Sequence, residues 1–82
     1  MHESGLAKDI VRRAVREAEA CRGARVLALD IIMGTETYVD RAALALGIVA
    51  ASLGTLAEGA VVNFAEGSGS GVVLESIQVM EV

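Results

Sequence analysis

The first three residues of the chain place its only histidine beside the α-amino group. The amine of Met1, the backbone amide of His2 and the Nδ1 atom of His2 can close adjacent chelate rings on one ion, with Glu3 next in the chain. A tetragonal set of nitrogen ligands of this kind suits Ni(II) or Cu(II). The amine and the imidazole must lose protons to bind, at pKa values of about 7.7–8.0 and about 6.5, so such a site would bind more weakly in acid.

A second interpretation of the same residues is an exposed histidine at a poorly ordered chain end, where most terminal residues lie. On these three residues alone, this second interpretation is the simpler one. Zinc fits less well than Ni(II), because a closed structural zinc site needs about four thiolate or imidazole ligands. The chain has one Cys and one His, so no zinc is expected.

Composition limits the classes of partner and the compartment. Hydrophobic residues make up 54% of the 82 residues, aromatic residues make up 2%, and the formal net charge is -4. An acidic chain with few rings repels phosphate backbones and anionic lipids and cannot stack on bases, so neither nucleic acid nor a membrane is an expected partner. The unpaired Cys21 and the lack of a signal peptide predict a cytoplasmic protein.

The elements that position the start of the chain can be predicted from hydrophobic spacing. Apolar residues recur at intervals of three and four over residues 5–21, with charged residues between them, which predicts an amphipathic helix. Ser4 is the expected N-cap, which would leave the first three residues outside the first turn. Gly23 is expected to end the helix.

A strand is predicted from Arg25 to Ile32, because strongly and weakly apolar residues alternate there with a period of two. Its strongly apolar face is expected to carry Leu27, Leu29 and Ile31. Residues 34–37 break this pattern and are expected to form a loop.

Three further elements complete a small α+β fold. A helix over about 40–53 is expected to end at Gly54, and strands are expected at 60–66 and 72–82. The segment Gly67 to Gly71 between these strands is typical of a short, flexible hairpin connection. The order α-β-α-β-β predicts two helices packed on a small three-stranded mixed sheet, in a single domain spanning residues 1–82.

The second predicted helix has no charged residue after Arg41, since none lies between Arg41 and Glu58. This apolar run is shorter than the roughly twenty residues of a membrane span, so it is expected to be a buried helix of a soluble protein. A helix without a polar stripe needs cover on both faces. We expect one face to pack on the sheet, and Ala45, Val49 and Leu53 to form a subunit or partner interface, within residues 42–53.

Several motifs together resemble the HypA/HybF family of hydrogenase nickel-maturation metallochaperones. The resemblance covers essentially all 82 residues and follows the same order of elements. It rests on the Met-His-Glu start, the amphipathic helix and strand that follow, a glycine like Gly34, the ungapped stretch from Val39 to the Gly-Thr-x-Ala-Glu-Gly-Ala turn at 54–60, and a last strand over 73–79.

The resemblance implies a nickel-binding metallochaperone domain for hydrogenase maturation, which catalyses no reaction. By position, His2 and the Met1 amine would bind Ni(II), while Glu3 would assist binding or contact with a maturation GTPase. A hydrogenase large subunit is the other partner that the family implies. Asp40 lies where an acidic residue has been linked to this site in some members, and it would orient the imidazole or serve as a fourth ligand. A carboxylate placed at a helix start by the helix dipole explains Asp40 equally well.

The chain also departs from the family pattern. Family members carry a zinc domain with two Cys-x-x-Cys pairs between the last two strands, and here Gly67 to Gly71 stands in its place. Together with the apolar second helix, this departure keeps a second function open, namely a structural or assembly module that oligomerises or binds partner subunits without delivering metal. An enzyme fits least, because Glu3, Asp40 and Glu58 have no identifiable acid-base partner nearby.

Overall fold

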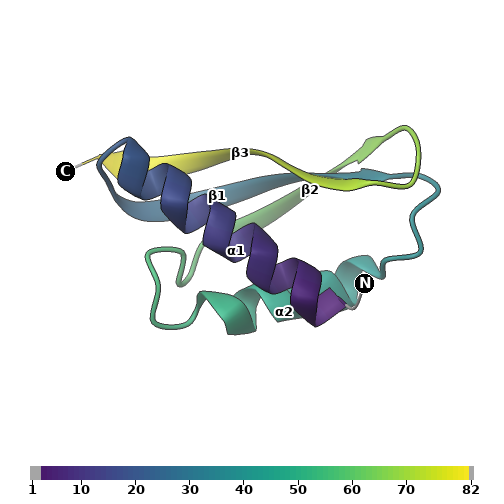
Figure 1. The fold of residues 1–82 in the computed structure, drawn as a ribbon, viewed down its shortest axis with the longest axis horizontal. Helices are drawn as coiled ribbons and strands as arrows, with labels where there is room; N and C mark the ends of the chain where they lie inside the picture. The colour runs from purple at the N-terminus through teal and green to yellow at the C-terminus, as the bar shows by residue number, and fades with distance from the viewer. Residues whose placement is uncertain (1–2, 82) are drawn as a thin grey trace.

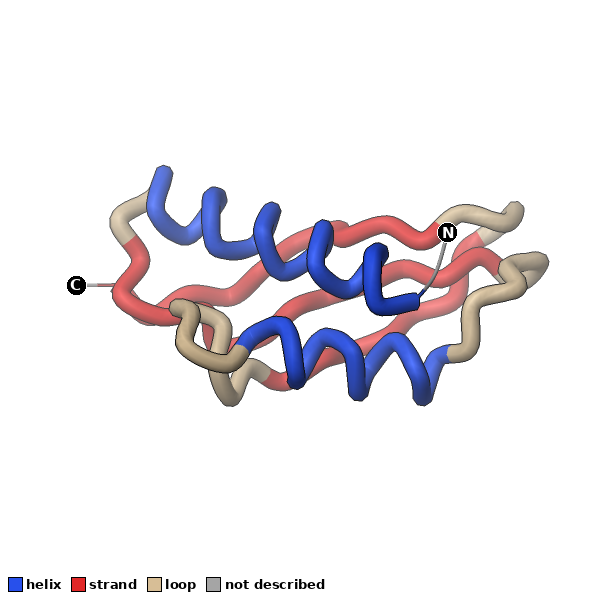
Figure 2. Tube along the Cα trace, turned by 60° about the horizontal axis from the view of Figure 1, so that its bottom comes forward, coloured by secondary structure: helices blue, strands red, loops and turns tan. Residues whose placement is uncertain are grey.

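The computed structural model describes residues 3–81 and has two layers, with both helices on one face of a three-stranded sheet (Figures 1 and 2). This confirms the predicted α+β class and the order of the elements. The elements are α1 (Glu3–Ala20), β1 (Gly23–Gly34), α2 (Arg41–Ser52), β2 (Val61–Gly67) and β3 (Val72–Glu81).

The sheet is mixed, as predicted, and its strand order is β2-β1-β3. Strand β1 pairs in parallel with β2 and antiparallel with β3. The prediction of a hairpin between the last two strands is therefore wrong, because β1 lies between them. The chain instead leaves β1, crosses through α2 to the parallel strand β2, and then passes across the end of β1 to reach β3.

The segment after β2 is held by backbone hydrogen bonds to the end of β1. Gly34 donates its N–H to the carbonyl of Gly71 at 2.7 Å, Thr35 donates to Gly67 at 3.0 Å, and Glu36 donates to Gly69 at 2.9 Å. Gly69 has a φ of 80°, in the left-handed region that favours glycine. The segment that the sequence predicted to be a flexible hairpin loop is thus a hydrogen-bonded crossover.

Both ends of α1 differ from prediction. The helix begins at Glu3, so Ser4 lies within the first turn and is not the N-cap. The helix ends at Ala20, and the residue with left-handed backbone is Arg22, with a φ of 58°, rather than Gly23. Gly23 has another role, because a Cβ at this position would lie 3.0 Å from the Cβ of Val79 in β3.

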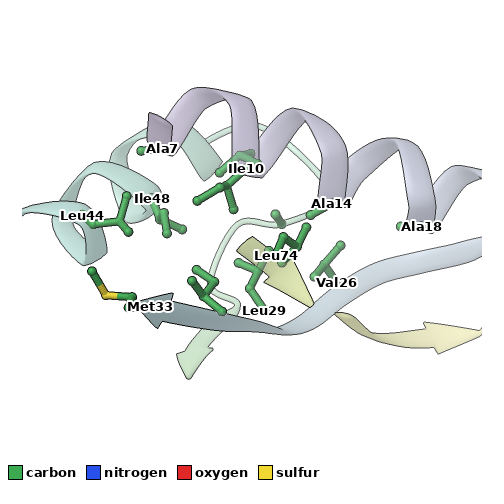
Figure 3. Packing of buried hydrophobic residues seen from close by; sticks show 13 residues of the cluster. Ala7, Ile10, Ala14, Ala18, Val26, Leu29, Met33, Leu44, Ile48 and Leu74 are labelled. Atoms are coloured by element: carbon green, nitrogen blue, oxygen red, sulfur yellow. The ribbon is translucent and has the colours of Figure 1, made fainter. Parts of the chain in front are cut away.

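The core lies between α1, α2 and the covered face of β1 (Figure 3). Leu29 and Ile31 are buried there as predicted, but Leu27 is 42% exposed. The register of β1 against β3 shifts between Val26 and Ala28, and this irregularity changes the alternation of faces. Val26 therefore takes the inward position that the sequence had predicted for Leu27.

Helix α2 lies beside α1, and the two helices run in the same direction (Figures 1 and 2). Leu44 and Ile48 point into the core near Ala7 of α1 (Figure 3). Buried Ser52 donates its hydroxyl to the carbonyl of Ile48 at 2.6 Å, and Gly54 follows with a φ of 76°, as predicted for the helix end. Within residues 3–81, no helix combines the length and the apolar character needed to cross a membrane.

We expect Gly34→Ala to destabilise the fold by about 1–3 kcal/mol, because the added Cβ would collide with the backbone carbonyl of Gly69. Gly71→Ala is the matched control, since Gly71 accepts the hydrogen bond from Gly34 but a Cβ there meets no atom within 4 Å. Its free energy of unfolding should stay within about 0.5 kcal/mol of wild type. Urea unfolding of the two variants measures the difference, and equal midpoints would contradict the tight crossover.

Candidate metal centre

The topology brings the starts of both helices to one end of the molecule. Helices α1 and α2 both run opposite to β1, so their first residues lie near the end of β1 at Gly34 (Figures 1 and 2). Glu3 begins α1, and Asp40 directly precedes α2. Met1 and His2, the two predicted nitrogen donors, lie outside the described residues. The structure therefore brings the backbones of Glu3 and Asp40 to the end where those donors attach.

Asp40 holds the N-cap position of α2, with extended backbone angles of φ -77° and ψ 121°. Its exposed side chain makes no capping hydrogen bond, so no helix N–H occupies the carboxylate. The position agrees with the dipole interpretation of Asp40, since the N-terminal end of a helix carries a partial positive charge. The same carboxylate also remains available to a ligand at this end of the molecule.

A surface groove of about 430 Å³ lies at this end, lined by residues of β1, β2 and the loop before α2. Arg41 lines the groove, and its guanidinium carbon lies 5.4 Å from the ring centroid of Phe64, within the range of a cation–π contact. Glu66 also lines the groove and contributes a carboxylate to it. Among residues 5–81, whose side chains the structure describes, no three His, Cys, Asp or Glu side chains group closely enough to hold a metal ion. A metal centre at this end would therefore depend on Met1 and His2.

Glu58 has a structural role in the turn over residues 54–60. Its Oε1 accepts a hydrogen bond from the N–H of Gly54 at 2.7 Å, and its backbone carbonyl accepts one from Nη2 of Arg25 at 2.7 Å. Thr55 Oγ1 donates to Ser52 and accepts from the N–H of Ala57. The turn that resembles the family motif thus closes the end of α2 and ties it to β1.

Sequence reasoning missed a polar cluster on the uncovered face of the sheet. Asp30, on β1, accepts a hydrogen bond at 3.0 Å from the amide of Asn63 on β2 and another at 3.0 Å from the hydroxyl of Ser76 on β3. These bonds, that of Asn63 first, hold the pKa of Asp30 below its ordinary value of 3.8, against a smaller opposing effect of burial. The signal that the sequence offered for this cluster was Asp30 itself, an aspartate in the middle of an apolar strand.

The architecture matches that of a known metallochaperone. The chain is similar to the solution structure of the Ni metallochaperone HypA from Helicobacter pylori, with a TM-score of 0.88 over 100% of both chains. Sequence identity is only 8%, so this similarity shows the fold alone. The fold is therefore that of a HypA-like domain.

The sequence has a nearer relative in the hydrogenase maturation factor HypA of Chlorobaculum tepidum, which is 34% identical over 71 residues. The alignment covers 87% of this chain but 63% of that protein, so the chain spans less than two thirds of its relative's length. No family model matches the chain. The two similarities confirm the resemblance to the HypA/HybF family that the sequence motifs indicate.

We expect Asp30→Asn to lower the stability of the fold at neutral pH and to have progressively less effect in acid. The folded-state pKa of Asp30 is lowered, so the ionised carboxylate stabilises the fold above its ordinary pKa. That contribution is lost as the pH falls through the lowered folded-state value. Urea midpoints measured from about pH 7 to about pH 2 test this, and the gap between variant and wild type should close in acid.

The control for this titration is Glu75→Gln, which removes an exposed carboxylate from the neighbouring strand β3. It should leave the pH dependence of the midpoint close to that of wild type. A gap between Asp30→Asn and wild type that stays constant with pH would contradict the role of the ionised carboxylate.

Proposed function

We propose that the chain is a nickel-binding metallochaperone domain for hydrogenase maturation, which carries Ni(II) at its N-terminus. The observation that carries this proposal is the similarity to HypA, combined with a histidine at position 2 of the chain. The relatives are named as a hydrogenase maturation factor and as a Ni metallochaperone. Neither name denotes an enzyme, and the proposed role is carriage rather than catalysis.

In this proposal, nickel is a cargo bound by the Met1 amine and by the amide and Nδ1 nitrogens of His2. Glu3 and Asp40 supply negative charge at the starts of the two helices, where the helix dipoles would otherwise oppose a cation. Ala7 packs the first turns of α1 against α2, so core packing fixes the start of α1 relative to α2 (Figure 3). A site with few protein ligands can release its ion by ligand exchange.

The recipients in this proposal are a hydrogenase large subunit or a maturation GTPase, and the compartment is the cytoplasm. The direct crossover from β2 to β3, closed by Gly67 and Gly69, completes the fold of the described residues without a zinc-binding insertion. Folding of this domain is therefore proposed to be independent of zinc.

Nickel titration by calorimetry tests the ligand set. Removing a residue that only orients a metal ligand lowers metal affinity by about 10–100-fold. We expect His2→Ala to lower the nickel affinity by more than this, because it removes a ligand itself. One extra residue before Met1 should weaken binding in the same way, since it displaces the amine from the chelate. Asp40→Asn should lower the nickel affinity by about 10–100-fold if the Asp40 carboxylate orients the imidazole.

Binding should also weaken as the pH falls through about 7.7–8.0 and then about 6.5, where the amine and the imidazole take up protons. Cys21→Ser is the control, because the exposed Cys21 lies at the opposite end of α1 from the proposed site. Unchanged affinity in both His2→Ala and the extended chain would overturn the N-terminal site.

The second candidate function is an assembly module that associates through α2. Val49 and Leu53 are 57% and 66% exposed, as expected from their predicted interface role. Ala45 is instead half-buried, and Leu46, which was not predicted, is 72% exposed. The outward face of α2 is thus apolar and uncharged, which favours contact with another apolar surface.

If α2 mediates self-association, Val49→Glu should shift the chain toward the monomer in sedimentation velocity, because a charge would be buried in the interface. Tyr38→Glu is the control, since Tyr38 is fully exposed in the loop before α2. A wild-type chain that stays monomeric at high concentration would contradict self-association and leave the carrier function unaffected.

A further inference from the structure

A basic groove runs along the flank of α1, separate from the candidate metal centre. Lys8, Arg12 and Arg16 recur at intervals of four residues and line this groove, whose volume is about 430 Å³. Its floor is apolar, since Val11 is buried and Val15 is half-buried. Thr55, in the turn after α2, completes the lining, so the groove opens beside the second helix.

The charge of this groove is opposite to that of the whole chain. The chain has a formal net charge of -4, whereas the groove lining carries three cationic side chains and one carboxylate, that of Glu19. In the described part of the chain, two ion pairs form on α1, between Arg12 and Asp9 at 3.2 Å and between Arg13 and Glu17 at 3.7 Å. Neither pair involves Lys8 or Arg16. The groove therefore keeps a positive surplus on an acidic molecule.

An apolar surface adjoins this basic groove. Leu53 is 66% exposed and lies two residues before Thr55, which lines the groove. This surface thus has a cationic side chain every four residues along α1, an apolar floor, and the exposed apolar residue Leu53 beside it. This combination matches the recognition mode in which an amphipathic helix lies in a groove, with its apolar face inward and its charged residues beside opposite charges.

We propose that this groove docks an acidic amphipathic helix of another protein. Cations four residues apart are separated by about 6 Å along α1, which equals the spacing of carboxylates at positions i and i+4 of a partner helix. From Lys8 to Glu19 the groove extends about 17 Å, which corresponds to about three turns of helix.

A second copy of the chain does not supply such a helix. Helix α2 has no carboxylate between Arg41 and Ser52, and in α1 the carboxylates of Asp9 and Glu17 are already paired with arginines of the same helix. The apolar floor formed by Val11 and Val15 offers nothing to a phosphate backbone, whereas it suits the apolar face of a helix. The occupant is therefore a different protein with an acidic helix, and the proposal does not depend on nickel binding.

The test uses a fluorescent peptide of about three helical turns, with leucines on one face and glutamates at i, i+4 and i+8 beside them. Fluorescence anisotropy with the full chain at low salt should show binding that weakens as salt is added. Arg16→Glu should reduce the affinity about tenfold, because it replaces an attraction with a repulsion.

Arg13→Glu is the matched control, since it makes the same charge change on the same helix but lies outside the groove. It should bind the peptide within about twofold of wild type. Glu19→Gln should tighten binding, because it removes the carboxylate of the groove. Circular dichroism of each variant establishes that the fold is kept, and His2→Ala should bind the peptide like wild type.

Three outcomes would overturn the proposal. The first is an equal loss of affinity in Arg13→Glu and Arg16→Glu, which would indicate attraction by overall charge. The second is equal binding of a peptide in which lysines replace the glutamates. The third is binding to phosphatidylserine vesicles that depends on Arg16 in the absence of any peptide binding, which would make the groove a lipid contact.

Discussion

Strand β1 is the element on which the rest of the domain depends, because it is hydrogen-bonded on both sides and covered on one face. Its parallel pairing with β2 requires the chain to return through α2, and its antiparallel pairing with β3 requires the crossover over Gly34. Both helices consequently run opposite to β1, so both start at the same end of the sheet. The neighbourhood of the candidate metal centre is thus a consequence of strand pairing.

Local patterns were sufficient to predict the elements, but not their pairing. Spacings of three and four located the first helix and a period of two located the first strand, because these periods arise from backbone geometry. The second helix was predicted from an apolar run that ends at Gly54. Leu27 faced outward because the register between β1 and β3 shifts between Val26 and Ala28, and β3 lies far along the chain. The segment 67–71 has a composition that suits a hairpin or a crossover equally. The choice between a hairpin and a crossover depends on which strands pair over long range, and no local sequence pattern indicates that pairing.

The candidate site, too, could be predicted from the sequence only in part. Met1 and His2 could be proposed from sequence because their donor atoms are adjacent along the chain, and the resemblance to HypA added Asp40. The structure contributes the shared end of the two helix starts. The Asp30 cluster could not be predicted, because its partners Asn63 and Ser76 lie 33 and 46 residues away. A carboxylate becomes identifiable as the centre of a network only when the strand order is known.

The position of the basic groove on α1 connects the two proposals. One side of the helix, with Ala7 and Ala14, packs in the core, and a second side carries the basic groove, which ends at Lys8. Lys8 follows Glu3 by five residues, a rise of about 7.5 Å along the helix. A partner helix seated in the groove would therefore begin about 7.5 Å from Glu3, at the end of the domain to which the proposed nickel ligands attach. Docking in the basic groove would then hold a partner near the end of the domain from which we propose that nickel is transferred.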